Sequence, residues 1–156
     1  MIGDLILVHN EGWLFDQIRA ISKCEYDHIA IQVTENLIVE ATPTKGVKVE
    51  PLLKYNCFKK KVLRLKDQSA VAKMVEFSLA RTGSKYDYLN LVRLYLKVLF
   101  HTKRSLSDLD IHGAFICVEL VSKSASYAGF NFNEATRHAN ITMAHILGSD
   151  KIELVA

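Results

Sequence analysis

Two apolar segments, residues 28–33 and 37–42, are separated by only the three polar residues 34–36. Apolar segments joined by so short a loop are typical of a β-hairpin. Asn36 can adopt the left-handed backbone conformation that three-residue hairpin loops need. The sequence therefore predicts an antiparallel strand pair, and the loop length sets its register so that Ala30 faces Glu40.

This register places two chemically reactive side chains on one face of the hairpin. His28 and Glu40 become diagonal neighbours, roughly 7–8 Å apart, a separation that two medium-length side chains can bridge. The opposite face is entirely apolar and consists of Ile29, Ile31, Val33, Leu37, Val39 and Ala41. Because a carboxylate within an apolar strand is costly unless it is paired, we expect Glu40 to be paired with His28.

A cysteine, Cys117, opens an amphipathic segment much later in the chain, at residues 115–121. A thiol is mostly protonated at neutral pH, but a helix N-terminus and a neighbouring imidazolium both favour the thiolate. The combination predicts a cysteine-nucleophile site in which Cys117 attacks, His28 transfers protons and Glu40 orients the imidazole. Taken singly, Cys117 and His28 are each also compatible with a structural role, and the pairing of the histidine with a carboxylate favours the catalytic interpretation.

An acyl-transfer site also needs donors for the oxyanion that develops on the substrate. The backbone N–H of Cys117, at the start of the predicted helix, is one candidate. The hydroxyl of Tyr86 or Tyr88 is a candidate for the second donor.

The rest of the chain alternates between strand-like and helix-like patterns, which predicts an α+β fold with a mainly antiparallel sheet. The expected strands are 3–9, 47–49, 58–65 and 152–155, and with the hairpin the strands up to residue 65 are expected to form a meander. The expected helices are 12–23, packed over the sheet, 67–80, capped by Asp67, 88–100, largely buried, 117–128 and 142–147. A polar connecting loop is expected at 101–113.

Composition narrows the class of protein. The 156 residues are 49% apolar and 24% charged, with no linker-like stretch, which predicts a single domain over residues 1–156. The net charge of +3 and the short basic cluster 59–61 indicate a solvated face rather than a nucleic-acid-binding surface. Neither a signal sequence nor a transmembrane segment is predicted, so we expect a cytoplasmic protein.

Three cysteines, without paired ligand spacing, argue against a disulfide framework and a structural zinc site. Only Cys24 and His28 lie close enough in sequence to suggest a metal-ligand pair, so a metal site involving Cys24 and Cys117 is a weak alternative. We expect no cofactor and no metal. The oligomeric state is not determined by the sequence.

The motifs together resemble the YiiX/YebB-like branch of the NlpC-type, papain-like cysteine hydrolases. The matching segments are Gly3-Asp4-Leu5-Ile6, His28-Ile29-Ala30-Ile31, Val39-Glu40-Ala41, the segment 83–88, Phe115-Ile116-Cys117-Val118-Glu119-Leu120-Val121 and the segment 141–149. In that branch the papain-like chain is circularly permuted, so that the histidine and its polar partner precede the cysteine, as they do here. The resemblance implies that Cys117 is the nucleophile, His28 the base and Glu40 the orienting residue.

The resemblance also implies a reaction. Members of the family hydrolyse amide bonds in peptides through an acyl-thioester, and relatives with the same permuted core act on lipid acyl groups. We therefore expect a cysteine hydrolase that acts on a peptide-like amide, with a lipid acyl hydrolase or acyltransferase as an alternative. A third hypothesis is a non-catalytic binding or inhibitory module on the same scaffold.

Overall fold

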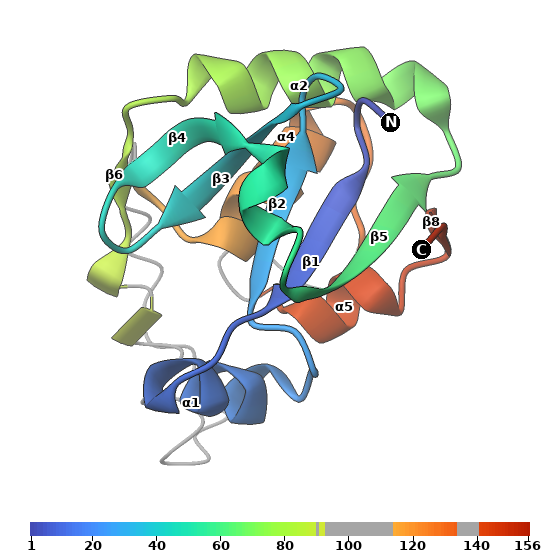
Figure 1. Cartoon of the computed structure of the whole chain (residues 1–156). Coiled ribbons are helices and arrows are strands. Elements are labelled where there is room, and N and C mark those ends of the chain that lie inside the picture. Colours follow the sequence, from blue (N-terminus) through green and yellow to red (C-terminus); the bar gives the residue numbers. More distant parts are fainter. Residues whose placement is uncertain (90, 93–113, 134–140) are drawn as a thin grey trace.

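A six-stranded antiparallel sheet with strand order β4-β3-β2-β1-β5-β8 forms the centre of the fold (Figure 1). The computed structural model describes residues 1–89, 91–92, 114–133 and 141–156. The strands of the sheet are β1 (Leu5–His9), β2 (His28–Gln32), β3 (Leu37–Thr42), β4 (Gly46–Pro51), β5 (Lys59–Leu65) and β8 (Ile152–Leu154). The described helices are α1 (Trp13–Ser22), α2 (Val71–Ala80), α4 (Cys117–Tyr127) and α5 (Met143–Leu147), with short 3-10 turns η1 (Leu52–Tyr55) and η2 (Gln68–Ala70).

The predicted hairpin is confirmed as β2 and β3. Ile31 pairs with Val39 and Gln32 with Ile38, and the backbone N–H of Val33 donates to the carbonyl of Leu37 at 2.9 Å. This is the register that a loop at residues 34–36 dictates. Towards His28 the ladder of this strand pair ends at Ile31, so His28, three residues earlier in the chain, is not paired with β3, although it pairs with Val8 of β1.

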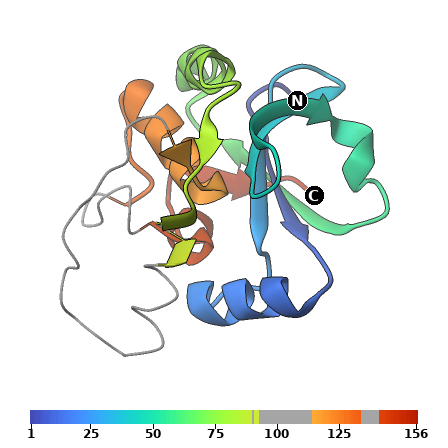
Figure 2. The same ribbon diagram turned by 90° about the vertical axis from the view of Figure 1, so that its left-hand side faces the viewer.

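The prediction of a simple meander is wrong at the fourth connection. β4 pairs with β3, but β5 does not pair with β4. The chain instead crosses the sheet, and β5 pairs with β1, on the side of β1 away from β2. The turn η1 lies within this crossing and packs on the face opposite the helices (Figure 2). The crossing is favoured because it lets Tyr55 and Leu52 cover Ile38, Ala30 and the rest of that apolar face.

Two apolar clusters stabilise the two faces of the sheet. The larger cluster joins alternate residues of β1, β2 and β3 to buried side chains of α2, α4 and α5, among them Leu7, Ile31, Met74, Leu120 and Ile146. The smaller cluster consists of Ile6, Val8, Ala30, Ile38 and Tyr55. Because side chains alternate between faces along a strand, one strand supplies both clusters.

The remaining helices agree with the sequence in part. The Asp67 side chain accepts a hydrogen bond from the backbone N–H of Ser69 at 2.9 Å, as expected of a cap. The helix at residues 12–23 was expected over the sheet, but α1 lies beyond one end of the sheet, with Trp13 72% exposed (Figures 1 and 2). A helix whose largest apolar side chain faces solvent does not need a sheet face to cover it.

The predicted helix 88–100 is described only at residues 88–89 and 91–92. Tyr88, Leu89 and Val92 are each more than half exposed, so the expectation of a buried helix is wrong for these residues. Residue 90, the remainder of that helix and the loop 101–113 lie outside the described residues. Over the described part of the chain, no helix has the length and apolar character needed to cross a membrane.

A second, two-stranded sheet was not predicted. β6 (Lys85–Tyr86) runs parallel to β7 (Ala114–Phe115), which directly precedes α4. The turn before β6 is tied to β4, because Val47 N–H donates to Ser84 O and Gly83 N–H donates to Val47 O, each at 2.9 Å. This small sheet therefore fixes Tyr86 beside the start of α4.

The junction between β4 and residues 83–84 requires a glycine at position 46. Gly46 has φ +68°, and a Cβ there would lie 2.2 Å from the carbonyl oxygen of Ser84. Gly83 also has a positive φ, +90°, but a Cβ there would meet nothing within 4 Å. A side chain at position 83 would therefore cause only backbone strain, whereas a side chain at position 46 would cause both backbone strain and a steric collision.

We predict that Gly46→Ala destabilises the protein more than Gly83→Ala. Both variants carry left-handed strain of about 1–2 kcal/mol, and Gly46→Ala adds a backbone collision of about 1–3 kcal/mol. Urea denaturation of the two variants and the wild type measures the free energy of unfolding. Equal losses in the two variants would contradict the close approach of β4 to Ser84.

Candidate active site

Glu40, on β3, is a buried carboxylate with three side-chain partners. Its side chain is 1% exposed. Oε2 accepts a hydrogen bond from the Tyr55 hydroxyl at 2.5 Å and lies 2.7 Å from Nε2 of His28, while Oε1 pairs with the ammonium group of Lys54. These contacts satisfy both oxygens, which is what makes a charge tolerable at this depth.

His28 lies between two partners. Its Nε2 lies 2.7 Å from Oε2 of Glu40, and its ring also interacts electrostatically with the Cys117 side chain. The ring lies 6.0 Å from that of Tyr55, measured between centroids, and His28 is 8% exposed. The imidazole thus lies between Glu40 of β3 and Cys117 of α4.

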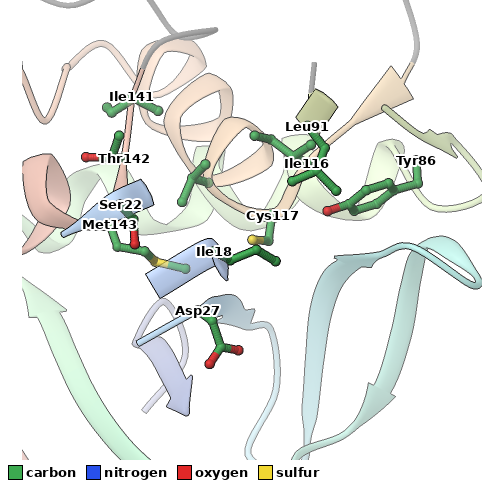
Figure 3. Close-up of a pocket in the computed structure, with 11 residues that line it drawn as sticks. Ile18, Ser22, Asp27, Tyr86, Leu91, Ile116, Cys117, Ile141, Thr142 and Met143 are labelled. Atoms are coloured by element: carbon green, nitrogen blue, oxygen red, sulfur yellow. The ribbon is translucent and has the colours of Figure 1, made fainter. Parts of the chain in front are cut away.

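Cys117 is the first residue of α4, and Ile116 precedes it in extended conformation. The first N–H groups of a helix have no acceptor within the helix and carry its partial positive charge, which favours a negatively charged sulfur at this position. Cys117 is 9% exposed, and its sulfur lies at the wall of a cavity (Figure 3). The sequence-predicted residues His28, Glu40 and Cys117 are thus brought together.

The contacts perturb two pKa values in opposite directions. Burial disfavours the imidazolium of His28, but the hydrogen bonds and charges of Cys117 and Glu40 outweigh burial and raise the pKa of His28 from its usual 6.5 to about 10. Burial likewise disfavours the carboxylate of Glu40, but His28, Lys54 and Tyr55 outweigh it and lower its pKa from 4.5 to about 2. The charged pair is therefore the favoured state around neutral pH.

The two candidate tyrosines are placed differently. The Tyr86 hydroxyl points towards Cys117 in Figure 3, and none of the described residues hydrogen-bonds with it. Burial and the nearby charge of Cys117 raise the pKa of Tyr86, so its hydroxyl stays protonated. The Tyr88 hydroxyl instead donates to the carbonyl oxygen of Pro43, and Tyr88 is 56% exposed. Of these two tyrosines, Tyr86 is the one whose hydroxyl points towards Cys117.

Two residues of the site, Lys54 and Tyr55, were missed from the sequence. Both lie in η1 and both bind Glu40, and the ammonium group of Lys54 also lies 4.8 Å from the centre of the Tyr55 ring. A lysine and a tyrosine in a short connecting segment carry no local signal of such a role. The only signal in the sequence is Glu40 itself, because a buried carboxylate needs hydrogen-bond donors or positive charges around it.

Comparison with known proteins relates the chain to one family. The family model for permuted papain-like amidase enzymes, YaeF/YiiX, of the C92 family, matches residues 1–93, a range that includes His28 and Glu40 and ends before Cys117. Among solved structures, the crystal structure of the metalloprotein YiiX from Escherichia coli O157:H7 matches with a TM-score of 0.73 and 16% sequence identity, covering 100% of this chain and 96% of that one. The search among curated proteins found no match.

The YiiX structure is described as that of a metalloprotein. Within residues 1–89, 91–92, 114–133 and 141–156, no group of three or more His, Cys, Asp and Glu side chains is placed to hold a metal ion. Cys24, the other cysteine considered as a ligand, is half-buried, and its sulfur accepts a hydrogen bond from the backbone N–H of Tyr26.

We predict that Glu40→Gln destabilises the protein most between about pH 4.5 and 6.5. The pKa of His28 is raised on folding, so its stabilising effect is complete below pH 6.5 and is lost as the pH rises to about 10. The pKa of Glu40 is lowered, so its effect is complete above pH 4.5 and is lost as the pH falls towards 2. Chemical denaturation of both proteins from pH 3 to 10 should show a loss of roughly 3 kcal/mol at the maximum, shrinking on both sides.

Glu50→Gln is the matched control for this profile. Glu50 is paired with Lys45 at 2.8 Å, and this lowers the pKa of Glu50, but the pair lies near the surface and involves no histidine. Glu50→Gln should lower the free energy of unfolding by less than about 1 kcal/mol. This loss should not change between pH 6.5 and 10. A Glu40→Gln profile that is flat above pH 6.5 would contradict a buried Glu40–His28 ion pair.

Proposed function

Because the chain belongs to the C92 family of permuted papain-like amidases, we propose that it hydrolyses an amide bond through an acyl-thioester on Cys117. His28 is the base in this proposal, and Glu40 orients the imidazole. The substrate class we propose is a peptide-like or acyl amide of low molecular weight. The observation that carries the proposal is the buried 2.7 Å contact between Glu40 and His28, together with the electrostatic interaction of the His28 ring with the Cys117 side chain.

Acylation begins with the thiolate of Cys117. The sulfur attacks the carbonyl carbon of the amide, and a C–S bond forms as the carbonyl oxygen becomes an oxyanion. The C–N bond then breaks, and His28 transfers its proton to the departing nitrogen, which leaves as an amine. Glu40 keeps the ring directed towards the sulfur, and its negative charge stabilises the imidazolium that persists until this transfer.

Deacylation reverses the role of His28. The imidazole, now neutral, removes a proton from water, and the resulting hydroxide attacks the thioester carbon. The C–S bond breaks, the acyl group leaves as a carboxylic acid, and Cys117 regains its thiolate beside the imidazolium. Lys54 and Tyr55 hold Glu40 throughout, so they act as positioning residues.

Both steps pass through an oxyanion that needs hydrogen-bond donors. The backbone N–H of Cys117 is one donor, because it lies in the first turn of α4 and has no acceptor within the helix. The Tyr86 hydroxyl is the second donor in this proposal, supported by its direction towards Cys117 and its raised pKa.

We predict that iodoacetamide alkylates Cys117 rapidly at pH 6 and that His28→Ala slows this reaction about 100-fold. An ordinary thiol is less than about 1% thiolate at that pH, whereas the imidazolium of His28 persists to about pH 10 and favours the thiolate. Peptide mass spectrometry gives the rate at each cysteine separately.

Cys24 and Cys57 are internal controls in the same molecule. Burial raises the pKa of the half-buried Cys24 thiol, and Cys57 is exposed, so both should react slowly at pH 6 in either protein. If Cys117 reacts no faster than Cys57, or ignores the His28 substitution, a non-catalytic module on this scaffold becomes the better explanation.

We predict that Tyr86→Phe lowers kcat for amide hydrolysis by roughly 10²–10³-fold with little change in KM, because it removes one oxyanion donor. Tyr88→Phe is the matched control, since its hydroxyl is bonded to Pro43, and it should change kcat less than about twofold. Circular dichroism confirms that both variants are folded. Equal effects of the two substitutions would exclude Tyr86 as the donor.

A further inference from the structure

Helix α1 packs weakly on the rest of the protein, although it lies beside the Cys117 sulfur. Its residues Ile18 and Ser22 form part of the wall of the cavity at that sulfur (Figure 3). None of the α1 side chains that the structure describes belongs to either apolar cluster, and among them only Ser22 is buried. Because little apolar surface holds α1 in place, moving it costs less than moving α2 or α4.

The cavity that α1 helps to enclose is small. Its volume is about 70 Å³, well below the roughly 300–1,000 Å³ of pockets for drug-sized ligands, and Cys117 is 9% exposed. A bulky molecule can therefore reach the sulfur from this side only when a part of the wall moves.

A polar contact ties α1 to the site. Arg19, in the last turn of α1, is paired with Asp27, which directly precedes His28, and donates to the carbonyl oxygen of Asn10 at 2.7 Å. The side chain of Asp27 is 0% exposed and that of Arg19 is 13% exposed. Among the α1 side chains that the structure describes, only Arg19 makes a hydrogen bond or ion pair to a residue outside the helix. We call the Arg19–Asp27 ion pair the latch.

Release of the latch leaves neither charged group without a partner. Asp27 also accepts hydrogen bonds from the backbone N–H of Asn10 at 2.9 Å and from its side-chain amide at 2.6 Å. Arg19 is also paired with Asp16, which lies on α1 and moves with it. Breaking a buried ion pair is most costly when one charge is left alone, so these second partners make release of the latch reversible.

The backbone at both ends of α1 suits a hinge. Gly12, before the helix, has φ +126°, and Lys23, after it, has φ +50°. In the part of the chain that the structure describes, Lys23 is the only residue other than glycine with a positive φ, so its backbone is strained. A rotation at Lys23 that swings α1 away can relieve this strain, and hinge motions are absorbed by a few residues at the ends of an element.

We propose that α1 is a gate beside Cys117, held closed by the Arg19–Asp27 latch, that swings about Gly12 and Lys23 to admit a bulky substrate. The closed gate lets only small molecules reach the sulfur. This inference goes beyond the proposed amide hydrolysis, because the gate controls what reaches the thiol whether or not the thiol turns over a substrate.

The first test compares iodoacetamide with its bulky, uncharged N-adamantyl derivative on the wild type and on Arg19→Gln. Both reagents form an S–C bond at a thiolate as iodide leaves, and at about pH 8.5 an ordinary thiol also reacts, so the test does not need an activated Cys117. Without the latch the open state is more populated, so the adamantyl reagent should label Cys117 about tenfold faster than in the wild type, and iodoacetamide less than about twofold faster.

Asp16→Asn is the matched control for this test. It removes the other ion pair of Arg19, whose Asp16 side chain is 63% exposed, and keeps the latch, so labelling should stay within about twofold of the wild type. Peptide mass spectrometry gives the rates, with the exposed Cys57 as the internal reference, and circular dichroism checks that each variant is folded. An adamantyl rate that is the same in folded Arg19→Gln as in the wild type, or that rises equally in Asp16→Asn, would overturn the gate.

The second test keeps the latch intact and decides the question even if Arg19→Gln does not fold. Trp13, the first residue of α1, is the only tryptophan in the chain, so its time-resolved fluorescence anisotropy reports the motion of α1. In a Cys57→Ser background, an adamantyl adduct on Cys117 should hold the gate open and lower the residual anisotropy of Trp13, whereas the smaller iodoacetamide adduct should not. Equal anisotropy for the two adducts would contradict the gate.

These outcomes separate the gate from the hydrolase. Labelling of Cys117 that depends on reagent size in the wild type and loses that dependence in Arg19→Gln, without any amide turnover, would support the gate and refute the hydrolase. Amide turnover, combined with adamantyl labelling that ignores Arg19→Gln, would refute the gate and support the hydrolase.

Discussion

The buried carboxylate of Glu40 is the constraint around which the site is arranged. A charge at 1% exposure is tolerable only with full compensation, and here His28, Lys54 and Tyr55 supply it. The same contacts fix the imidazole ring and keep it charged to about pH 10. Stability and the proposed chemistry therefore depend on one interaction.

The arrangement of layers explains how that interaction reaches the thiol. Helix α4 packs on one face of the sheet, and η1 packs on the other (Figure 2). His28 connects the two, since its ring contacts Glu40 and also interacts with the side chain of Cys117, the first residue of α4. The crossing of the chain from β4 to β5 brings η1 onto Glu40, so the departure from a meander and the compensation of the acid have the same origin.

The sequence predicted those parts of the site that rest on local patterns. Loop length and strand periodicity gave the register that puts Glu40 diagonal to His28, and the amphipathic pattern after Cys117 gave the start of α4. Lys54 and Tyr55 were not predicted as partners of Glu40. Their role depends on a connection whose path over the sheet is decided by burial of the whole face, and the sequence of that short connection does not indicate the path.

What the sequence by itself determined is the family, the α+β class, the hairpin register and the residue types of the proposed triad, because each depends on spacing along the chain or on motif order. Only the tertiary structure decided that Tyr86, and not Tyr88, faces Cys117, and that Lys54 and Tyr55 bind Glu40. Both outcomes depend on contacts between residues far apart in sequence, such as the pairing of β6 with β7. Such contacts arise from the joint burial of many side chains, which no local pattern encodes.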